Sequence, residues 1–370
     1  MLLFSSCHEH DGKKPHYTTD SDHTLLIYIE GDNTLSTFAQ TNIESCKEGL
    51  LQSDNPINLV IYKDNRSAGD GLPVLFQLKK SPKTAKIDTI YIKRWEADHN
   101  SASPAIMAEI IDLTFRTFDT PVKGIDFWSH GMSWIPSSAW ASSSVNRAPA
   151  YIGQDNGDYM EIWQLREALE QSQVHPDYLI FDACHMATAE VAYELRNCSD
   201  WMVASETEIM GEGFPYAAIM QSLSKSNDLF TTLQMTVNDY QEAYYDNGSC
   251  SLIRLSGMEE LRKAFRNCNF PAEWSTIEEE YSLQHYGRKR TGARYYFYNL
   301  AEVCRDDSMV IEALNYVVVN SYASSYFSDG IEGLRISKDC GLAISLPQFF
   351  YMSADCENLK KAYPLLEWNR

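Results

Sequence analysis

The stretch DYLIFDACHMATAEVAYELRNCSDWMVAS, residues 177–205, predicts the order strand, cysteine, helix, strand. Residues 178–181 form a short apolar run that is typical of a buried strand in a parallel sheet. Apolar residues then recur every four positions, as on the inner face of a helix, at Ala187, Val191 and Leu195. A second apolar run follows at residues 201–204. Cys184 is therefore expected at the carboxyl end of a strand, where open α/β sheets bind ligands.

This position suits a nucleophile. The helix is expected to begin directly after Cys184, and a helix N-terminus favours the thiolate form of a cysteine. The best candidate for a base is His130, 54 residues upstream, because the apolar run at 125–128 predicts a strand that ends just before it. Parallel neighbouring strands would bring both residues to one edge of the sheet. His185 is an alternative base, but adjacent side chains at a helix start diverge.

Two further residues have roles that follow from these positions. Gly131 has no side chain, so its backbone can approach a substrate closely. Its N–H and that of Cys184 form a candidate oxyanion hole. Asp182 precedes Cys184 by two residues and is expected on the same face of the strand. A carboxylate beside a catalytic thiol opposes thiolate formation, unless it faces a pocket that binds a cation.

The chain resembles the clostripain family of cysteine peptidases, within the caspase-like clan. The resemblance is carried by the segments IYIEGDNTLS (27–36), WSHGMSW (128–134), FDACHMATAEVAYEL (181–195), SETE (205–208) and GEGFPY (211–216). It is clear over residues 24–250 and looser over 250–370. Two residues depart from the family pattern, Ser129 where Asp is usual and Ser133 where Gly is usual. They bear on the geometry of the loop around His130.

The resemblance implies a cysteine endopeptidase that cleaves peptides and proteins after Arg or Lys. It implies that Asp182 lines the pocket for that basic residue, with Glu212 as a second acidic candidate and Glu206 as a structural residue. Family members mature by cleavage between their His and Cys segments, so the basic residue of the Ser-rich loop at 136–157, Arg147, is a candidate site of self-processing. No cofactor is needed for the chemistry, although calcium dependence is known for some relatives.

A second hypothesis belongs to a different class of protein. The departures at Ser129 and Ser133 favour a non-catalytic surface lipoprotein that keeps the fold and binds basic peptides. The N-terminal MLLFSSC resembles the end of a bacterial lipoprotein signal, with Cys7 as the residue that would be lipidated and tether the chain to a membrane. Both hypotheses predict an exported bacterial protein of the periplasm, cell surface or extracellular space.

Composition excludes several other classes. A net charge of −20 over 370 residues argues against nucleic-acid binding, which needs basic patches. The longest apolar runs are far shorter than a membrane span. Nine cysteines are scattered without a C-x-x-C pair, so neither a zinc ribbon nor a disulfide scaffold is indicated. No metal-ligand spacing is found, including among the four histidines before residue 24.

The overall pattern predicts an α/β fold, caspase-like, with a mostly parallel sheet flanked by helices and a smaller C-terminal α+β portion. We expect a tether at 1–23, a catalytic domain at 24–250 and a C-terminal subdomain at 251–370. The expected helices are 34–51, 103–118 with Ser103 as N-cap and Pro104 next, 158–171, 226–245, 257–268, 272–284 and 307–320. The expected strands outside the motifs are 25–29, 57–62, 74–78, 87–92, 251–255, 321–327, 333–337 and 342–346.

Overall fold

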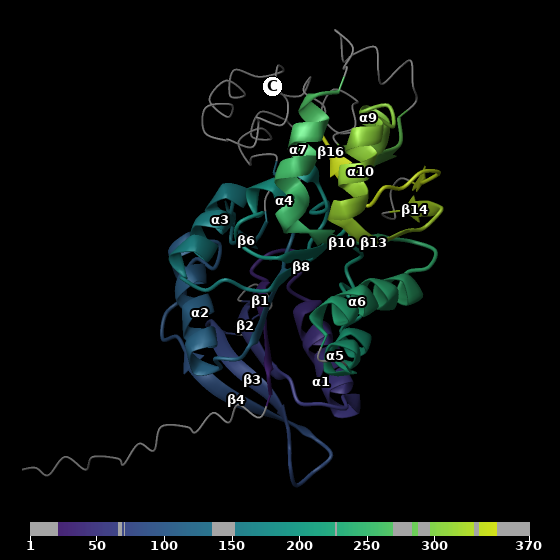
Figure 1. The fold of residues 1–370 in the computed structure, drawn as a ribbon. Helices are drawn as coiled ribbons and strands as arrows, with labels where there is room; N and C mark the ends of the chain where they lie inside the picture. Colours follow the sequence, from purple (N-terminus) through teal and green to yellow (C-terminus); the bar gives the residue numbers. More distant parts are fainter. Residues whose placement is uncertain are drawn as a thin grey trace, which may run out of the picture.

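The computed structural model describes residues 21–65, 69, 71–134, 152–225, 228–268, 283–287, 297–328 and 333–345. A nine-stranded sheet runs through its centre in the order β13-β10-β9-β8-β5-β1-β2-β3-β4 (Figure 1). The strands of this sheet are β1 (His23–Glu30), β2 (Asn58–Asp64), β3 (Val74–Lys80), β4 (Ile87–Arg94), β5 (Val122–Trp128), β8 (Tyr178–Asp182), β9 (Trp201–Ala204), β10 (Ser249–Arg254) and β13 (Val318–Ala323).

The middle of the sheet is parallel and its two flanks are antiparallel. Strands β2, β1, β5, β8 and β9 pair in parallel, while β3 and β4 on one side and β10 and β13 on the other pair antiparallel. The expected parallel, helix-covered sheet is therefore confirmed for the central strands. Their continuous apolar runs explain it, because a parallel strand is covered on both faces. Residues 25–29 of β1 are at most 2% exposed.

Helices cover both faces of the sheet, in two separate apolar cores. Figure 1 shows α1, α5 and α6 on one side and α2 and α3 on the other. The first side contains α1 (Ala39–Gln52), α5 (Tyr216–Lys225) and α6 (Leu229–Ala243). The second contains α2 (Pro104–Thr117), α3 (Ile162–Gln171), α4 (Ala189–Glu194), α7 (Met258–Arg266), α9 (Leu300–Val303), α10 (Ser308–Val317) and the 3-10 turn η3 (Leu255–Gly257).

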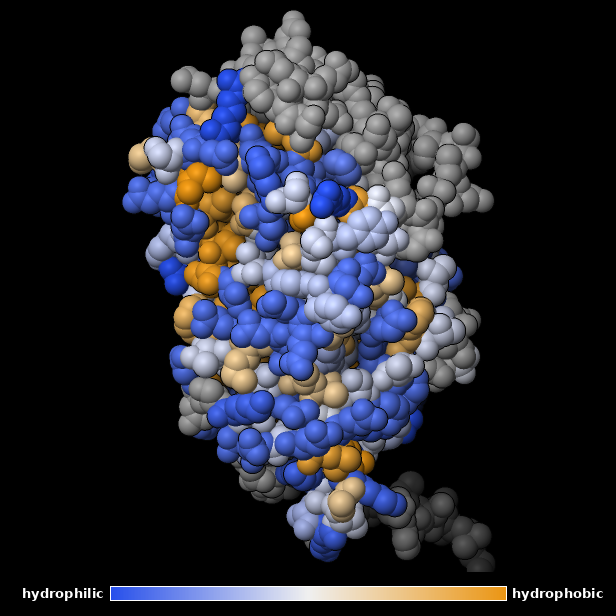
Figure 2. All heavy atoms as spheres, turned by 90° about the vertical axis from the view of Figure 1, so that its right-hand side faces the viewer, coloured by the Kyte–Doolittle hydropathy of each residue, from blue (hydrophilic) through white to orange (hydrophobic). Residues whose placement is uncertain are grey.

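The C-terminal part contributes to the same sheet. Strand β10 pairs with β9, and β13 pairs with β10. The remaining strands form small sheets, namely β6 (Gln154–Asp155) with β7 (Asp158–Tyr159), β14 (Tyr326–Ser328) with β15 (Gly333–Arg335), and β11 (His285–Tyr286) with β12 (Phe297–Asn299) and β16 (Ala343–Ile344). The face around α6 and β14 is largely hydrophilic, with a smaller group of hydrophobic residues toward its upper left in Figure 2.

Several element boundaries differ from the expectations. Residues 158–159 form strand β7 and α3 starts only at Ile162, because Glu161 and Gln164 form a capping box there. Helix α5 was not expected at all. Ser103 is the N-cap of α2 as predicted, but its side chain makes no capping hydrogen bond.

Some expectations concern residues outside the described ranges. These are residues 1–20 of the tether with Cys7, most of the loop at 136–157 including Arg147, and residues 272–282 of the predicted helix at 272–284. Residues 283 and 284, at the end of that predicted helix, are not helical. Within the described residues, no helix combines the length and apolar character needed to cross a membrane.

Candidate active site

The register of β5 and β8 brings the two motif loops together. These strands are parallel neighbours, and Trp128 lies opposite Asp182. His130 and Cys184 each follow two residues later, so both leave the carboxyl edge of the sheet side by side. A side chain at Gly131 would place its Cβ 2.8 Å from the Cys184 carbonyl oxygen and 3.0 Å from its nitrogen. The two loops are thus in backbone contact, which requires glycine at this position.

His130 is a partly exposed side chain held by a neighbouring strand end. Its Nε2 lies 2.7 Å from Thr34 Oγ1, which follows the turn after β1. Burial lowers the pKa of His130 to about 4, and the negative charge of Glu208 acts in the opposite direction. The imidazole is therefore neutral near pH 7 and able to accept a proton.

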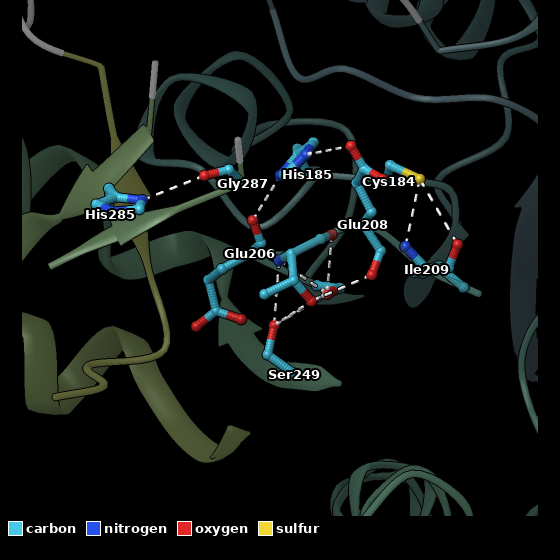
Figure 3. Close-up of polar contacts among 10 residues, drawn as sticks. Cys184, His185, Glu206, Glu208, Ile209, Ser249, His285 and Gly287 are labelled. Atoms are coloured by element: carbon cyan, nitrogen blue, oxygen red, sulfur yellow. Dashed lines mark hydrogen bonds and ion pairs between the residues drawn. The ribbon is translucent and has the colours of Figure 1, made fainter. Parts of the chain in front are cut away.

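Cys184 is partly exposed, and its sulfur is held by the loop after β9. The backbone N–H of Ile209 donates to Sγ at 3.2 Å, and Sγ lies 3.8 Å from the Ile209 carbonyl oxygen (Figure 3). The N–H of Ile209 is thus a polar group that contacts the sulfur directly, and it comes from a segment 25 residues further along the chain.

The predicted helix N-terminus next to Cys184 is wrong. Helix α4 begins only at Ala189, with Thr188 as N-cap accepting a hydrogen bond from the Val191 N–H. Residues 183–188 form a turn instead, in which His185 has a φ of 57°. A bridge between Thr188 and Ala343 keeps the residue before the helix extended. The helix dipole therefore acts at Thr188 and is remote from the sulfur.

His185, the alternative base, is buried under the C-terminal strands. It is 1% exposed, and its Nδ1 lies 2.7 Å from the Glu206 carbonyl oxygen, which can only accept, so Nδ1 carries a proton. The centroid of the Phe297 ring lies 5.0 Å from that of the imidazole ring. Glu208 Oε1 lies 3.8 Å from Nε2 (Figure 3). The His185 side chain is thus enclosed by protein and points away from solvent.

Asp182 lies beneath the Cys184 turn, on the α5 face of the sheet. It is 4% exposed, and its Oδ2 accepts hydrogen bonds from the Phe214 N–H at 3.0 Å and the Tyr216 hydroxyl at 2.9 Å. Burial raises the pKa of Asp182 to about 6, against the effect of those two hydrogen bonds. Asp126, one strand over and 1% exposed, has a pKa raised by burial and by the Asp182 charge.

Glu212 is on the same side of the site but on the surface. Its carbonyl oxygen accepts a hydrogen bond of 2.6 Å from Asn42 Nδ2. Burial is the main cause of the raised pKa of Tyr244, and the charges of Asp182 and Glu212 raise it further. Both acids therefore lie near this tyrosine. Tyr244 in turn donates to the Gly213 carbonyl oxygen at 2.5 Å. Glu206, by contrast, is fully buried and accepts a hydrogen bond from Ser251 Oγ.

The two departures from the family pattern are both engaged in hydrogen bonds. Ser129 Oγ donates to the Glu30 carbonyl oxygen at 2.9 Å and accepts from the Gln154 N–H at 3.2 Å. Ser133 has a φ of 60°, the conformation that favours glycine, and its Oγ lies 2.6 Å from Thr188 Oγ1. Ser133 therefore combines a strained backbone conformation with a hydroxyl contact to Thr188.

Sequence reasoning missed three residues that contact or influence the pair, Thr34, Glu208 and Ile209. Thr34 follows the Gly-Asp-Asn turn at the end of the first strand, which was a usable signal because this strand is parallel to β5. Glu208 ends the SETE segment (205–208) that helps to carry the family resemblance, but no role was assigned to it, and for Ile209 there was no local pattern. Among the described residues, no group of three or more His, Cys, Asp or Glu side chains is arranged to hold a metal ion.

Comparisons with known proteins identify the family. A model of the clostripain family matches residues 27–363. Clostripain from Hathewaya histolytica is 26% identical over 225 residues, which cover 54% of this chain and 42% of clostripain, so the match spans less than half of that relative.

Solved structures extend this result to the whole fold. An inactive zymogen C11 protease from Parabacteroides distasonis is 26% identical, with a TM-score of 0.80 over 95% of this chain and 99% of that one. A secreted C11 cysteine protease from Bacteroides thetaiotaomicron, solved with an irreversible peptide inhibitor, is 25% identical, with a TM-score of 0.78 over 94% of this chain and 98% of that one. The resemblance seen in the motifs is confirmed, and the chain belongs to the clostripain family of cysteine peptidases.

Proposed function

We propose that this chain is an endopeptidase in which Cys184 is the nucleophile and His130 the base, and that it cleaves after Arg or Lys. The observation that carries the proposal is the register of β5 and β8, which sets both residues at one sheet edge with their loops in backbone contact. Both side chains are partly exposed, so a substrate can reach them.

The chemistry follows from these positions. His130 takes the proton of the Cys184 thiol while Sγ attacks the scissile carbonyl carbon. The oxyanion that forms is stabilised by the N–H groups of Gly131 and Cys184. His130 then gives its proton to the leaving amine, which departs and leaves a thioester. Water, deprotonated by His130, attacks the thioester, and the released sulfur takes that proton back as the acid product departs.

Thr34 has the position of an orienting group. Its hydroxyl is bonded to Nε2 of His130, and no described residue bonds to Nδ1. We infer that Thr34 fixes the ring so that Nδ1 receives the thiol proton. The low pKa of His130 means that its imidazole is neutral at rest and free to accept that proton.

The basic side chain of the substrate is assigned to Asp182, with Glu212 at the entrance. One oxygen of Asp182 is held by Phe214 and Tyr216, and the other accepts no hydrogen bond from a described residue. A carboxylate that is fixed on one side and open on the other suits a guanidinium or ammonium group. No cofactor takes part in these steps, and a calcium requirement is tested by activity after chelation.

The direct test is a panel of fluorogenic peptides with Arg, Lys, Asp, Leu and Asn at the cleaved position. We expect turnover of the Arg and Lys peptides alone, and none by Cys184→Ala. The alternative, a non-catalytic binder of basic peptides, rests on the departures at Ser129 and Ser133. It predicts that iodoacetamide labels Cys184 no faster than a free thiol, whereas the enzyme predicts fast, pH-dependent labelling.

Two further proposals concern residues outside the described ranges. Self-cleavage at the Arg147–Ala148 bond predicts two fragments of the wild type on a denaturing gel and one intact chain for Cys184→Ala. Pro149, two residues beyond the bond, restricts the extended backbone that a peptidase requires. Export with lipidation of Cys7 predicts incorporation of a fatty-acid analogue into the wild type and none into Cys7→Ser.

A further inference from the structure

Trp134 and Glu190 belong to the quoted motifs and take no part in the chemistry described so far. Trp134 ends the segment that follows His130, and Glu190 lies in the first turn of α4, after the Cys184 turn. They are 3% and 0% exposed. Two polar side chains so deeply buried need partners, because an unpaired polar group in the interior is costly.

Ser345, which directly follows β16, joins the two residues. Its backbone N–H donates to Glu190 Oε1 at 2.8 Å, and its Oγ accepts from Trp134 Nε1 at 3.1 Å. The Trp134 indole and the Ser345 hydroxyl both also approach the Glu190 carboxyl group. Glu190 thus binds a segment 155 residues further along the chain and, through it, the end of the His130 loop.

A second set of contacts runs beside the first. Ser133 Oγ lies 2.6 Å from Thr188 Oγ1, and Thr188 is the N-cap of α4. The Ala343 N–H donates to the Ala187 carbonyl oxygen at 2.9 Å. The start of α4 is therefore the point at which β16, the Cys184 turn and the segment 131–134 are held together.

The environment of the Glu190 carboxyl group is nearly closed. Its Oε2 is buried and has no hydrogen-bond partner among the described residues. Burial raises the pKa of Glu190 to about 7, opposed chiefly by the hydrogen bond from the Ser345 N–H. Only one oxygen has to be an acceptor for the Ser345 contact, so a neutral amide could serve the same purpose.

We propose that Glu190 is a positioning residue which, through Ser345 and Trp134, fixes the segment 131–134 against the Cys184 turn and so places the Gly131 N–H in the oxyanion hole. The inference rests on the oxyanion role of Gly131 in the proposed function. It involves no proton transfer, and Glu190 does not touch the substrate.

The test compares two reactions of Cys184 that differ in their need for an oxyanion hole. Peptide hydrolysis needs it, and so does binding of a peptidyl-arginine aldehyde, which forms a tetrahedral adduct with the sulfur. Alkylation by iodoacetamide does not. For Glu190→Ala we expect kcat to fall about 100-fold, the size of a lost oxyanion donor, with little change in KM. Aldehyde affinity should fall by a similar factor, and the alkylation rate by less than about threefold.

Two variants make the comparison specific. Glu190→Gln keeps an acceptor oxygen and should hold kcat within about threefold of the wild type. Glu194→Gln is the matched control, since Glu194 is a 5% exposed carboxylate of the same helix that is bonded to Arg166 at 2.7 Å. We expect it to lower stability and leave kcat per folded molecule unchanged.

If Glu190→Ala does not fold, Trp134→Phe removes a single indole donor and should lower kcat about tenfold with alkylation retained. Equal losses of hydrolysis and alkylation would overturn the proposal, as would full hydrolysis by a folded Glu190→Ala or Trp134→Phe. A wild type without fast alkylation would instead overturn the assignment of the Cys184–His130 pair.

Discussion

The turn after β8 and the loop after β5 leave the same edge of the sheet but are held by different means. The β8 turn is held by its backbone, with the His185 N–H bonded to the Thr207 carbonyl oxygen at 3.0 Å and the Ala187 N–H to that of Ser205 at 2.9 Å. The β5 loop depends far more on side chains, through Ser129, Ser133 and Trp134. Single substitutions should therefore disturb the placement of His130 more readily than that of Cys184.

The largest expected difference is between substitutions of the two histidines, His130 in the β5 loop and His185 in the β8 turn. His130→Ala removes the base, so hydrolysis should fall by at least about 10³-fold, within the range for general-base catalysis. His185→Gln should unfold at a lower temperature, because it disturbs a buried ring, yet turn over within about tenfold of the wild type per folded molecule. Active-site titration combined with thermal melts measures both. A His185 variant that folds well and is inactive would reverse the assignment.

The next effect concerns the acid beneath the β8 turn. Asp182→Asn should lower kcat/KM for Arg and Lys peptides by a factor of about 10² to several thousand, because a buried cation without its carboxylate costs roughly 3–5 kcal/mol. Alkylation by iodoacetamide, which carries no charge, should change little. Unchanged kcat/KM for Arg peptides in a folded variant would remove Asp182 from the pocket.

A smaller effect is expected from pH. Asp182 must be ionised to bind a cation, and its pKa is raised to about 6. Activity on Arg peptides should be full above that value and decline about tenfold per pH unit as the pH falls below it. His130, with a pKa near 4, should remain neutral over most of this range. A kcat/KM profile from pH 4 to 8 checks this, and a flat profile between pH 5 and 7 would contradict it.

The smallest effect should come from the orienting group of the β5 loop. Thr34→Val removes one hydroxyl from Nε2 of His130 and keeps the shape of the side chain. Loss of one hydrogen bond of about 1 kcal/mol predicts a fall in kcat of roughly fivefold to tenfold. Thr34→Ser should restore most of the activity. If the valine and serine variants are equally slow, the hydroxyl is not what orients the ring.

Much of the central sheet was predictable, because its strands are marked by local apolar runs. The runs before His130 and Cys184 were sufficient to place both residues at one edge, as the register of β5 and β8 then showed. The resemblance of the Cys184 segment to the clostripain family also made the family predictable from the sequence. These signals are short-range, so they do not depend on how distant parts of the chain fold.

The surroundings of the pair could not be predicted in the same way. The start of α4 depends on Thr188 and on its bridge to Ala343, a residue 155 positions away. The donor on the Cys184 sulfur is a backbone N–H, which any residue other than proline at position 209 would supply. The contact between Glu190 and Ser345 likewise joins segments that no periodicity connects. Long-range hydrogen bonds leave no pattern in a single sequence.

The most direct test of the central claim is covalent labelling by a peptidyl-arginine acyloxymethyl ketone, followed by intact-mass measurement and peptide mapping. We predict one adduct per wild-type chain, on Cys184, with no labelling of Cys184→Ala and much slower labelling of His130→Ala. An adduct on another cysteine, or a wild type that stays unlabelled while it hydrolyses Arg peptides, would contradict the account.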